Sequence, residues 1–355
     1  MSEQRTGKAT AALFEQVILR RLGASDADVL VGPKHGVDVG VVQVAPGVAM
    51  AVTTDPVFVV PAYGWERAAW FAVHILASDA ATSGLSLRWM AVDLNLPPEI
   101  SDQDLTSLWD AFSRTCDDLG IAVVTGHTAR YDGCAWPMVG GATCVALGPD
   151  DAYVTPTMAR PGDRVVVTKG AAIEATALFA ATFPDRLAAG VGAEVVRQAD
   201  ALFEQMTVVP ETRIAAAFGL RDRGVTSMHD ATEGGVVGGL LEVAVASDVG
   251  MRIDLDAIPV RPEVRVVCDH VGIDPYTSIS EGTLIATLRP DRAIGYVEAC
   301  AREGIDAAIV GDVTEPADGR VLVDADGVEC ALEHPGLDPF WGAFGAWASE
   351  AAVAG

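Results

Sequence analysis

Residues 161–180 read PGDRVVVTKGAAIEATALFA, and they carry the signals of a strand, a tight turn and a helix in succession. After the Pro-Gly-Asp turn, RVVVT (164–168) is an apolar run of strand length. Lys169 follows at the junction with the helical pattern, where the free N–H groups of a helix start attract anions. We therefore predict a phosphate contact for Lys169, with an ordinary surface lysine as the alternative. The Walker pattern GxxxxGK[ST] does not occur in this stretch.

The residues just before this stretch mark a domain boundary. Segment 151–164, DAYVTPTMARPGDR, combines two prolines with the Pro-Gly-Asp turn, which is typical of a break between domains. A length of 355 residues also favours about two domains. We predict domains at 1–157 and 158–335, followed by a tail at 336–355 that could pack as a short helix.

Hydrophobic periodicity predicts the order of the elements on both sides of this boundary. In the first half we expect helices at 10–22, 65–83 and 102–119, and strands at 37–44, 48–55, 87–96, 121–130 and 137–148. In the second half we expect strands at 164–168, 224–230, 251–255, 283–288, 307–313 and 320–324, and helices near 172–181, 193–206, 211–219, 234–247, 261–271 and 291–303. The predicted fold class is α+β (α/β), with largely antiparallel or mixed sheets.

The charge balance is strongly acidic. The chain has 49 acidic and 24 basic residues, a net charge of −25, and its only lysines are Lys8, Lys34 and Lys169. Such a charge disfavours nonspecific binding to nucleic acids and to anionic membranes. Because the acids are scattered through an apolar-rich chain, we predict a globular protein with a solvated acidic surface, as in halophilic proteins of haloarchaea. In their salty cytoplasm the Debye length falls to about 3 Å, which screens self-repulsion.

The sequence also predicts a cytoplasmic location. No apolar run reaches the roughly 18 residues that a membrane span needs, and the polar start MSEQRTGKAT lacks the apolar core of a signal peptide. The six cysteines form no CxxC pair, which favours buried free thiols in a reducing compartment over a zinc site.

Five short acidic motifs are spread over most of the chain. They are HGVDVGVV (35–42), TTDP (53–56), ASDAATSG (77–84), HDATEGG (229–235) and SEGTL (280–284). Each motif places one carboxylate where an apolar run meets a turn of small residues; these acids are Asp38, Asp55, Asp79, Asp230 and Glu281. Carboxylates in such places can hold Mg²⁺ against a polyphosphate, so their order and chemistry indicate an enzyme that uses ATP.

Simpler explanations exist for these acids. Asp55 could cap a turn before Pro56, and Asp79, late in its helix, could merely be exposed. Asp38 could lie on the solvated face of an edge strand, although an Asp inside a β run is poorly explained by strand propensity. We predict instead that Asp55 ends its strand and faces a cleft. The small residues after Asp79 would let another group approach the backbone closely.

TGHTARY (125–131) follows an apolar strand and adds three candidates. Gly126 and Thr128 could offer backbone N–H and hydroxyl groups to a phosphate or a metal-bound water. His127 could be a metal ligand or a catalytic base, and a structural loop histidine is the alternative.

HDATEGG adds an acid and a helix start in one motif. Asp230 is expected at the end of a strand, and Thr232, Gly234 and Gly235 lead into the next helix, where N–H groups can bind phosphate. Thr232 would also fit as the N-cap of that helix, and the two roles are compatible. Glu281, in a turn before a strand, is a further candidate contact to the nucleotide.

Taken in order, these motifs resemble the AIR synthase (PurM-like) superfamily of ATP-binding enzymes. The resemblance is carried by VDVGVV, TTDPVFV, ASDAATSG, TGHT, PGDRVVVTKGAAIEATALFA, HDATEGG, IPV, GIDPYTSISEGTLIA and AIVGDV, and it covers roughly residues 30–325. The chain is most similar to the HypE-like and AIR synthase-related members of this group.

The resemblance implies a two-domain fold, with ATP and Mg²⁺ held in a cleft. The strands of the N-terminal domain would form a β-barrel with those of a second subunit, and a C-terminal α/β domain would cover the nucleotide. Asp38, Asp55, Asp79 and Asp230 would lie at the metal-binding or phosphate-proximal positions. The implied reaction transfers the γ-phosphate to a substrate oxygen, often to activate an amide or carbonyl oxygen for displacement.

Two departures from the family pattern bear on function. Many relatives have an Asp in the TGDT-type loop where this chain has His127, which would weaken one Mg²⁺ or favour Mn²⁺ or Zn²⁺. Hydrogenase-maturation members end with a cysteine, whereas this sequence ends EAAVAG, which leaves the acceptor open.

The resulting hypothesis is an ATP-dependent ligase, dehydratase or phosphotransferase that acts as a homodimer on a small-molecule or protein acceptor. Asp230 and His127 are its candidate catalytic residues. The alternatives are a small-molecule kinase resembling the thiamine-monophosphate kinase, and a nucleotide-binding maturation or assembly protein with low turnover.

Overall fold

The computed structural model describes residues 11–354, so Lys8 and the rest of the polar start lie outside the described residues. The chain divides into two compact units. The N-terminal unit comprises residues 27–32 and 38–153. Among the described residues, the C-terminal unit comprises residues 154–354 together with 11–26 and the segment 33–37. Two short stretches from the start of the chain therefore fold with the C-terminal unit.

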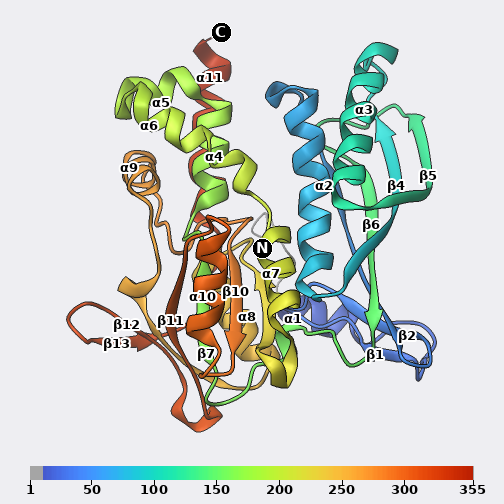
Figure 1. The fold of residues 1–355 in the computed structure, drawn as a ribbon. Helices are drawn as coiled ribbons and strands as arrows, with labels where there is room; N and C mark the ends of the chain where they lie inside the picture. The colour runs from blue at the N-terminus through green and yellow to red at the C-terminus, as the bar shows by residue number, and fades with distance from the viewer. Residues whose placement is uncertain (1–10, 355) are drawn as a thin grey trace. The chain divides into compact units, whose positions relative to one another are not determined.

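A mixed sheet with the strand order β13-β12-β9-β11-β7-β10-β8 forms the centre of the C-terminal unit (Figure 1). Its strands are β7 (Arg164–Thr168), β8 (Val225–Asp230), β9 (Gly250–Asp254), β10 (Leu284–Leu288), β11 (Ala307–Thr314), β12 (Arg320–Val323) and β13 (Glu329–Ala331). Strands β9 and β12 pair parallel, whereas β10 pairs antiparallel with β7 and β8. Strand β8 lies at one edge of this sheet.

Helices cover both faces of this sheet, which explains why RVVVT is apolar without alternation. Val165 and Val167 of β7 share a buried layer with α8 (Gly235–Ala246). Val166 points the other way, into a layer with residues of α7 (Val209–Phe218) and α10 (Ala293–Arg302). Successive strand residues face opposite sides, so a strand covered on both faces is apolar throughout.

A second group of helices in the C-terminal unit packs around α4 (Ile173–Thr182). It includes α5 (Pro184–Val191), α6 (Ala193–Asp200) and α9 (Pro262–Val271). The C-terminal helix α11 (Pro339–Ala354) lies along α4 (Figure 1). The rings of Phe179 and Phe183 on α4 lie 5.1–5.7 Å, between centroids, from those of Phe344 and Trp347 on α11. Aromatic packing thus fixes α11 to the unit.

The N-terminal unit has a sheet with the order β1-β2-β3-β6-β4-β5. Its strands are β1 (Val29–Val31), β2 (Gly40–Ala45), β3 (Val48–Phe58), β4 (Ser86–Leu96), β5 (Ala122–Arg130) and β6 (Met138–Pro149). Helices α2 (Trp65–Thr82) and α3 (Asp102–Leu119) pack on each other, and α2 lies against β3 and β6. Strands β4 and β5 pair parallel, and α3 supplies the crossover that this requires.

One face of the N-terminal sheet carries exposed apolar side chains. Ala51 of β3 and Met90 of β4 are fully buried, whereas their neighbours Val52 and Trp89, which face the other way, are partly or fully exposed. Val124 of the edge strand β5 is 58% exposed. The sheet therefore presents an apolar surface that this unit itself does not cover.

The structure confirms the α/β character and corrects several local expectations. Strand β2 begins at Gly40, so Asp38 precedes a strand and does not lie inside one. Strand β3 continues to Phe58, so Asp55 lies within it. Pro56 is tolerated there because β3 has already passed Val52, its last pairing with β2.

Some element boundaries also differ from the sequence expectations. The helix expected over 10–22 is helical at Ala11–Leu13 and continues as one π-turn over Phe14–Ile18. The short elements β1, α5 and β13 were not anticipated, because pieces of three to eight residues carry too little periodicity to be recognised.

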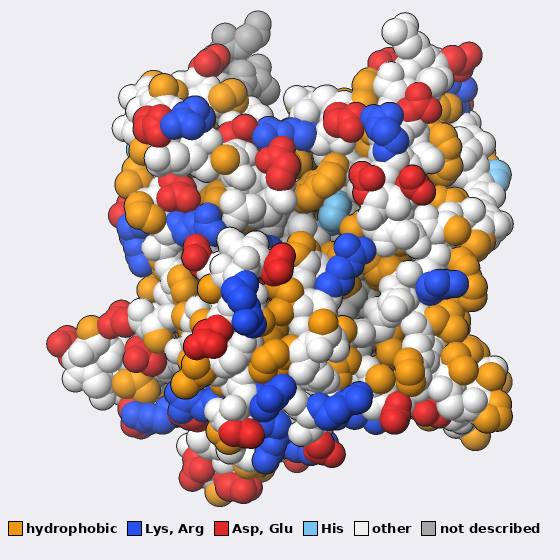
Figure 2. Space-filling model, viewed as in Figure 1, with side chains coloured by type: hydrophobic (Ala, Val, Ile, Leu, Met, Phe, Trp, Pro, Cys, Tyr) orange, Lys and Arg blue, Asp and Glu red, His pale blue; other side chains and the backbone are white. Residues whose placement is uncertain are grey.

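Acidic and basic side chains are interspersed on the face drawn in Figure 2. This mixture agrees with acids that are scattered along the sequence and not gathered in one segment. Among the described residues, no helix combines the length and the apolar character that a bilayer crossing requires.

Candidate functional site

In the N-terminal unit, one hydroxyl group links α2 to the strand that carries Asp55. The Thr53 hydroxyl on β3 donates a hydrogen bond to the Asp79 carboxylate near the end of α2, at 3.0 Å. Thr53 and Asp55 are two residues apart on one strand, so their side chains leave the same face of the sheet. The Asp55 side chain therefore leaves the same face of the sheet as Thr53, which binds Asp79.

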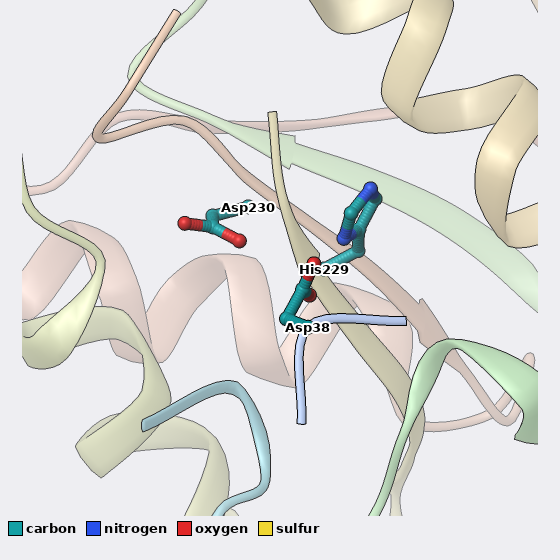
Figure 3. A group of neighbouring side chains, drawn as sticks. All are labelled: Asp38, His229 and Asp230. Atoms are coloured by element: carbon teal, nitrogen blue, oxygen red, sulfur yellow. The ribbon is translucent and has the colours of Figure 1, made fainter. Parts of the chain in front are cut away.

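In the C-terminal unit, Asp230 is the last residue of β8 and is fully buried. Figure 3 shows Asp230 and His229 on opposite sides of the strand, and it also labels Asp38, which begins the main segment of the other unit. A nitrogen of the His229 ring lies within 4.8 Å of an Asp230 carboxylate oxygen. At the end of this edge strand, a carboxylate oxygen and an imidazole nitrogen therefore lie close enough to hold one metal ion.

His229 is held by an acid on the neighbouring helix. Its Nε2 lies 2.8 Å from Oε2 of Glu242 on α8, and both side chains are buried. A carboxylate partner fixes the orientation of an imidazole ring. Gly36 packs closely against Glu242, because a Cβ on Gly36 would come within 2.7 Å of the Glu242 Cβ. This pair was not predicted, because Glu242 lies on a mostly apolar helix.

The residues 231–235 connect β8 to α8 through two glycines in the left-handed region. Gly234 has φ 80° and Gly235 φ 61°. The Gly234 N–H donates to the Asp338 carboxylate at 2.8 Å, and the Gly235 N–H donates to the Thr232 carbonyl at 3.0 Å. The glycines expected to contact phosphate therefore use these N–H groups inside the protein.

Buried acids gather around this connection. Glu174, in the first turn of α4, accepts a hydrogen bond from the Glu281 N–H at 3.0 Å. Burial, together with the nearby charges of Asp338, Glu233 and Asp230, raises the pKa of Glu174 to about 7. Burial likewise raises the pKa of Asp338 to about 6. The carboxyls of Glu174 and Asp338 are therefore protonated at a higher pH than ordinary acids.

We predict that stability falls as the pH rises through this range. A carboxyl whose pKa is raised on folding stabilises the protein fully below its unfolded pKa, and this contribution is lost towards the folded pKa. For Glu174 the window runs from the ordinary 4.5 to about 7. The free energy of unfolding should drop across it by on the order of 2 kcal/mol. Denaturant titrations at several pH values would measure this slope.

The matched variants are Glu174→Gln and Glu298→Gln. Glu174→Gln should flatten the pH dependence of the free energy of unfolding, because it removes the titrating group. Glu298→Gln, on the exposed side of α10, should leave the slope as it is. A wild-type slope in Glu174→Gln would rule out this assignment.

Lys169 has a structural role in the C-terminal unit. Its side chain is almost fully buried, and Nζ lies 2.5 Å from Oε1 of Glu211. The same Nζ donates to the carbonyl oxygens of Gln205, Thr207 and Gly282 at 2.6–3.2 Å. The surface-lysine alternative is therefore wrong. The phosphate contact stays a prediction that these internal bonds do not favour.

His127, Gly126 and Thr128 lie in the exposed edge strand β5 and not in a loop. The His127 Nε2 lies 2.9 Å from the Tyr131 hydroxyl. Gly126 is required by packing, because a Cβ would come within 2.4 Å of the Val92 carbonyl oxygen on β4. A backbone reason thus accounts for this glycine without a ligand.

Both units match one family along their length. Residues 36–159 match the N-terminal domain of AIR synthase related proteins, and residues 160–324 match their C-terminal domain. The chain belongs to the AIR synthase related proteins. The resemblance seen in the acidic motifs is thereby confirmed. The residues from 325 onward, with β13 and α11, lie beyond the matched region.

Individual AIR synthase related proteins extend this finding. The carbamoyl dehydratase HypE of Rhizobium leguminosarum bv. viciae is 28% identical over 276 residues, covering 76% of this chain and 74% of that protein. The crystal structure of E. coli HypE, a hydrogenase maturation protein, matches with a TM-score of 0.65 and 25% identity, covering 82% of this chain and 87% of that one.

A third similar protein is the hydrogenase maturation protein HypE in complex with ATP. Its structure has a TM-score of 0.64 and 21% identity, and the match covers 94% of this chain and 97% of that one. At this identity the likeness shows a shared fold. The PurM-like two-domain architecture is thus confirmed for the single chain.

Proposed function

We propose that this chain binds ATP with Mg²⁺ and uses it to activate an amide or carbonyl oxygen of an acceptor for displacement. The observation that carries the proposal is the fully buried Asp230 at the end of β8, followed at once by the glycine turn into α8. The 28% identical relative named carbamoyl dehydratase supports the choice of reaction.

The donor atoms fit the proposed cation. Asp38, Asp55, Asp79 and Asp230 offer carboxylate oxygens, which suit a hard ion such as Mg²⁺. Bound ATP would supply the phosphoryl group, and Mg²⁺ would neutralise the charge of the phosphates. In this proposal the chain's own contribution is to position its side chains: Thr53 orients Asp79, and Glu242 orients His229 next to Asp230.

Phosphate contacts remain part of the proposal in a reduced form. Thr232 and Gly235 lie in the connection between β8 and α8, and the Glu281 N–H donates to Glu174 beside it. Gly126 and Thr128 are exposed on β5 and could meet a ligand from the solvent side. Lys169 is left out, because its ammonium group already contacts several protein oxygens.

The experiment that tests this function measures ATP binding and turnover together. Phosphate release from ATP is followed in molar KCl with Mg²⁺, with and without amide acceptors such as carbamoyl compounds. Acceptor-dependent release supports amide activation. If ATP raises the melting temperature but no condition releases phosphate, the enzyme proposal fails and the low-turnover accessory role replaces it. If neither ATP nor ADP shifts the melting temperature, nucleotide binding itself is excluded.

We predict that Asp55→Asn and Asp79→Asn each weaken Mg-ATP binding about tenfold without unfolding the protein. Asparagine keeps the size of the side chain but removes a charge that would hold the cation. Calorimetric titration with Mg-ATP measures the affinity, and circular dichroism checks the fold. Asp110→Asn, on an exposed position of α3, is the matched control. Unchanged affinity in both variants would remove these residues from the site.

We further propose a homodimer that uses the exposed face of the N-terminal sheet. Trp89 and Met138, 39% and 61% exposed, are apolar side chains of the kind that interfaces bury. A second copy packed on this face would complete the β-barrel expected for the family. Sedimentation equilibrium that gives the mass of one chain at micromolar concentration would exclude this dimer.

A further inference from the structure

The helix α11 does more than end the chain, because its first turn contacts the connection between β8 and α8. The Asp338 carboxylate accepts the Gly234 N–H at 2.8 Å. The Trp341 indole N–H donates to the Glu233 carboxylate at 2.9 Å. Two adjacent residues of the connection are thus held by Asp338, which directly precedes α11, and by Trp341 in its first turn.

Packing at the same place is close. A Cβ on Gly234 would come within 3.3 Å of the Pro335 ring and 3.5 Å of the His334 ring nitrogen. The chain that leads into α11 therefore covers Gly234, which needs its left-handed conformation to make the turn. The residues 334–341 form a cover over this turn.

The two polar contacts are distinct from the ring contacts that anchor α11, to which the Trp341 ring also adds through Phe340. The anchor is the aromatic cluster with α4, supplemented by the Arg186 guanidinium, which lies 3.9 Å from the Trp347 ring centroid and pairs with Glu350 at 2.6 Å. Asp338 also caps α11 itself, because it accepts the Phe340 N–H at 2.9 Å. The anchoring contacts hold the helix, which leaves Trp341 and the second oxygen of Asp338 to fix the turn.

We propose that Asp338 and Trp341 are positioning residues that fix residues 231–235, and through them the place of Asp230 at the end of β8. This inference rests on the proposed function, since it assigns the turn to the binding of Mg-ATP. The cover lies outside the region that matches the family, which ends at residue 324.

The test uses two Trp→Phe variants on one helix. Trp341→Phe keeps a ring but loses the N–H that reaches Glu233, whereas Trp347→Phe changes only the anchoring cluster. Asp338→Asn is the third variant, since it removes the charge of the carboxylate whose Oδ2 accepts the Gly234 N–H. Amide hydrogen exchange of peptides over 231–236 is measured without ligand in each full-length protein. We expect exchange about fivefold faster in Trp341→Phe and Asp338→Asn, the effect of losing one hydrogen bond. Trp347→Phe should behave as the wild type.

The second readout separates positioning from a merely structural role. In ATP turnover, Trp341→Phe and Asp338→Asn should raise the KM for Mg-ATP about fivefold while kcat stays within about twofold, since the contacts preorganise binding. Faster exchange with an unchanged KM would overturn the positioning role, and unchanged exchange would overturn the contact itself. If the wild type neither binds nor turns over ATP, the proposed function fails. In that case the role of Asp338 and Trp341 in ATP binding is also ruled out. The exchange data still decide whether these residues fix the turn.

Discussion

We expect Lys169→Met to lower the free energy of unfolding by about 3–5 kcal/mol, the cost of breaking a buried ion pair by removing one partner. Glu211 is fully buried, so it would keep a charge without its cation, and the carbonyl groups of Gln205, Thr207 and Gly282 would lose their shared donor. Urea unfolding monitored by circular dichroism measures the change.

Two comparisons sharpen this result. The double variant Lys169→Met/Glu211→Gln should be more stable than the single variant, because it no longer leaves a buried charge unpaired. Lys34→Met, which loses one hydrogen bond to the Ala246 carbonyl, should cost about 1 kcal/mol. A cost for Lys169→Met as small as that of Lys34→Met would contradict the structural role of Lys169.

Asp230→Asn should reduce ATP-dependent phosphate release about 100-fold, the largest activity effect that we expect. The substitution keeps the shape of the side chain and removes the negative charge at the end of β8. Stability should stay the same or rise, because the Asp230 charge lies among other acids and raises the pKa of Glu174. Initial rates of phosphate release and denaturant unfolding measure both quantities on one sample.

The control for this variant is Ser227→Ala, at a buried position of the same strand. It should retain the wild-type rate within about twofold, since Ser227 lies three residues before Asp230 on β8. A normal rate in Asp230→Asn would refute a role for Asp230 in the reaction. Equal losses in both variants would point to general damage of β8.

The long helices and strands could be predicted from the sequence, because their hydrophobic patterns follow from which faces are buried. RVVVT is apolar throughout since both faces of β7 are covered, and the small residues around Asp230 mark the turn into α8. The contacts of Lys169 could not be predicted. Its partners Glu211 and Gly282 are far away in sequence, and nothing local distinguishes a buried lysine from an exposed one.

The acids around Glu174 were missed for a related reason. Glu174 lies in a helix start that also reads as a phosphate site, and Asp338 lies in a tail of small and aromatic residues. Their proximity depends on how α11 packs on α4, which is a property of the tertiary structure. Asp230 was identified correctly as a strand-end residue because its position depends on one strand and one turn.

The segment 33–37 has a consequence for how the protein is made. Lys34 bonds to Ala246, 212 residues later in the chain, at the end of α8. At about 5–20 residues per second, a ribosome needs roughly 10–40 s to add that stretch. During this time the segment 33–37 has left the ribosome, but α8, against which it packs, has not yet been synthesised. The C-terminal unit therefore cannot be completed from its own contiguous residues during synthesis, and a gene fragment starting at residue 154 would express a unit with part of its surface uncovered.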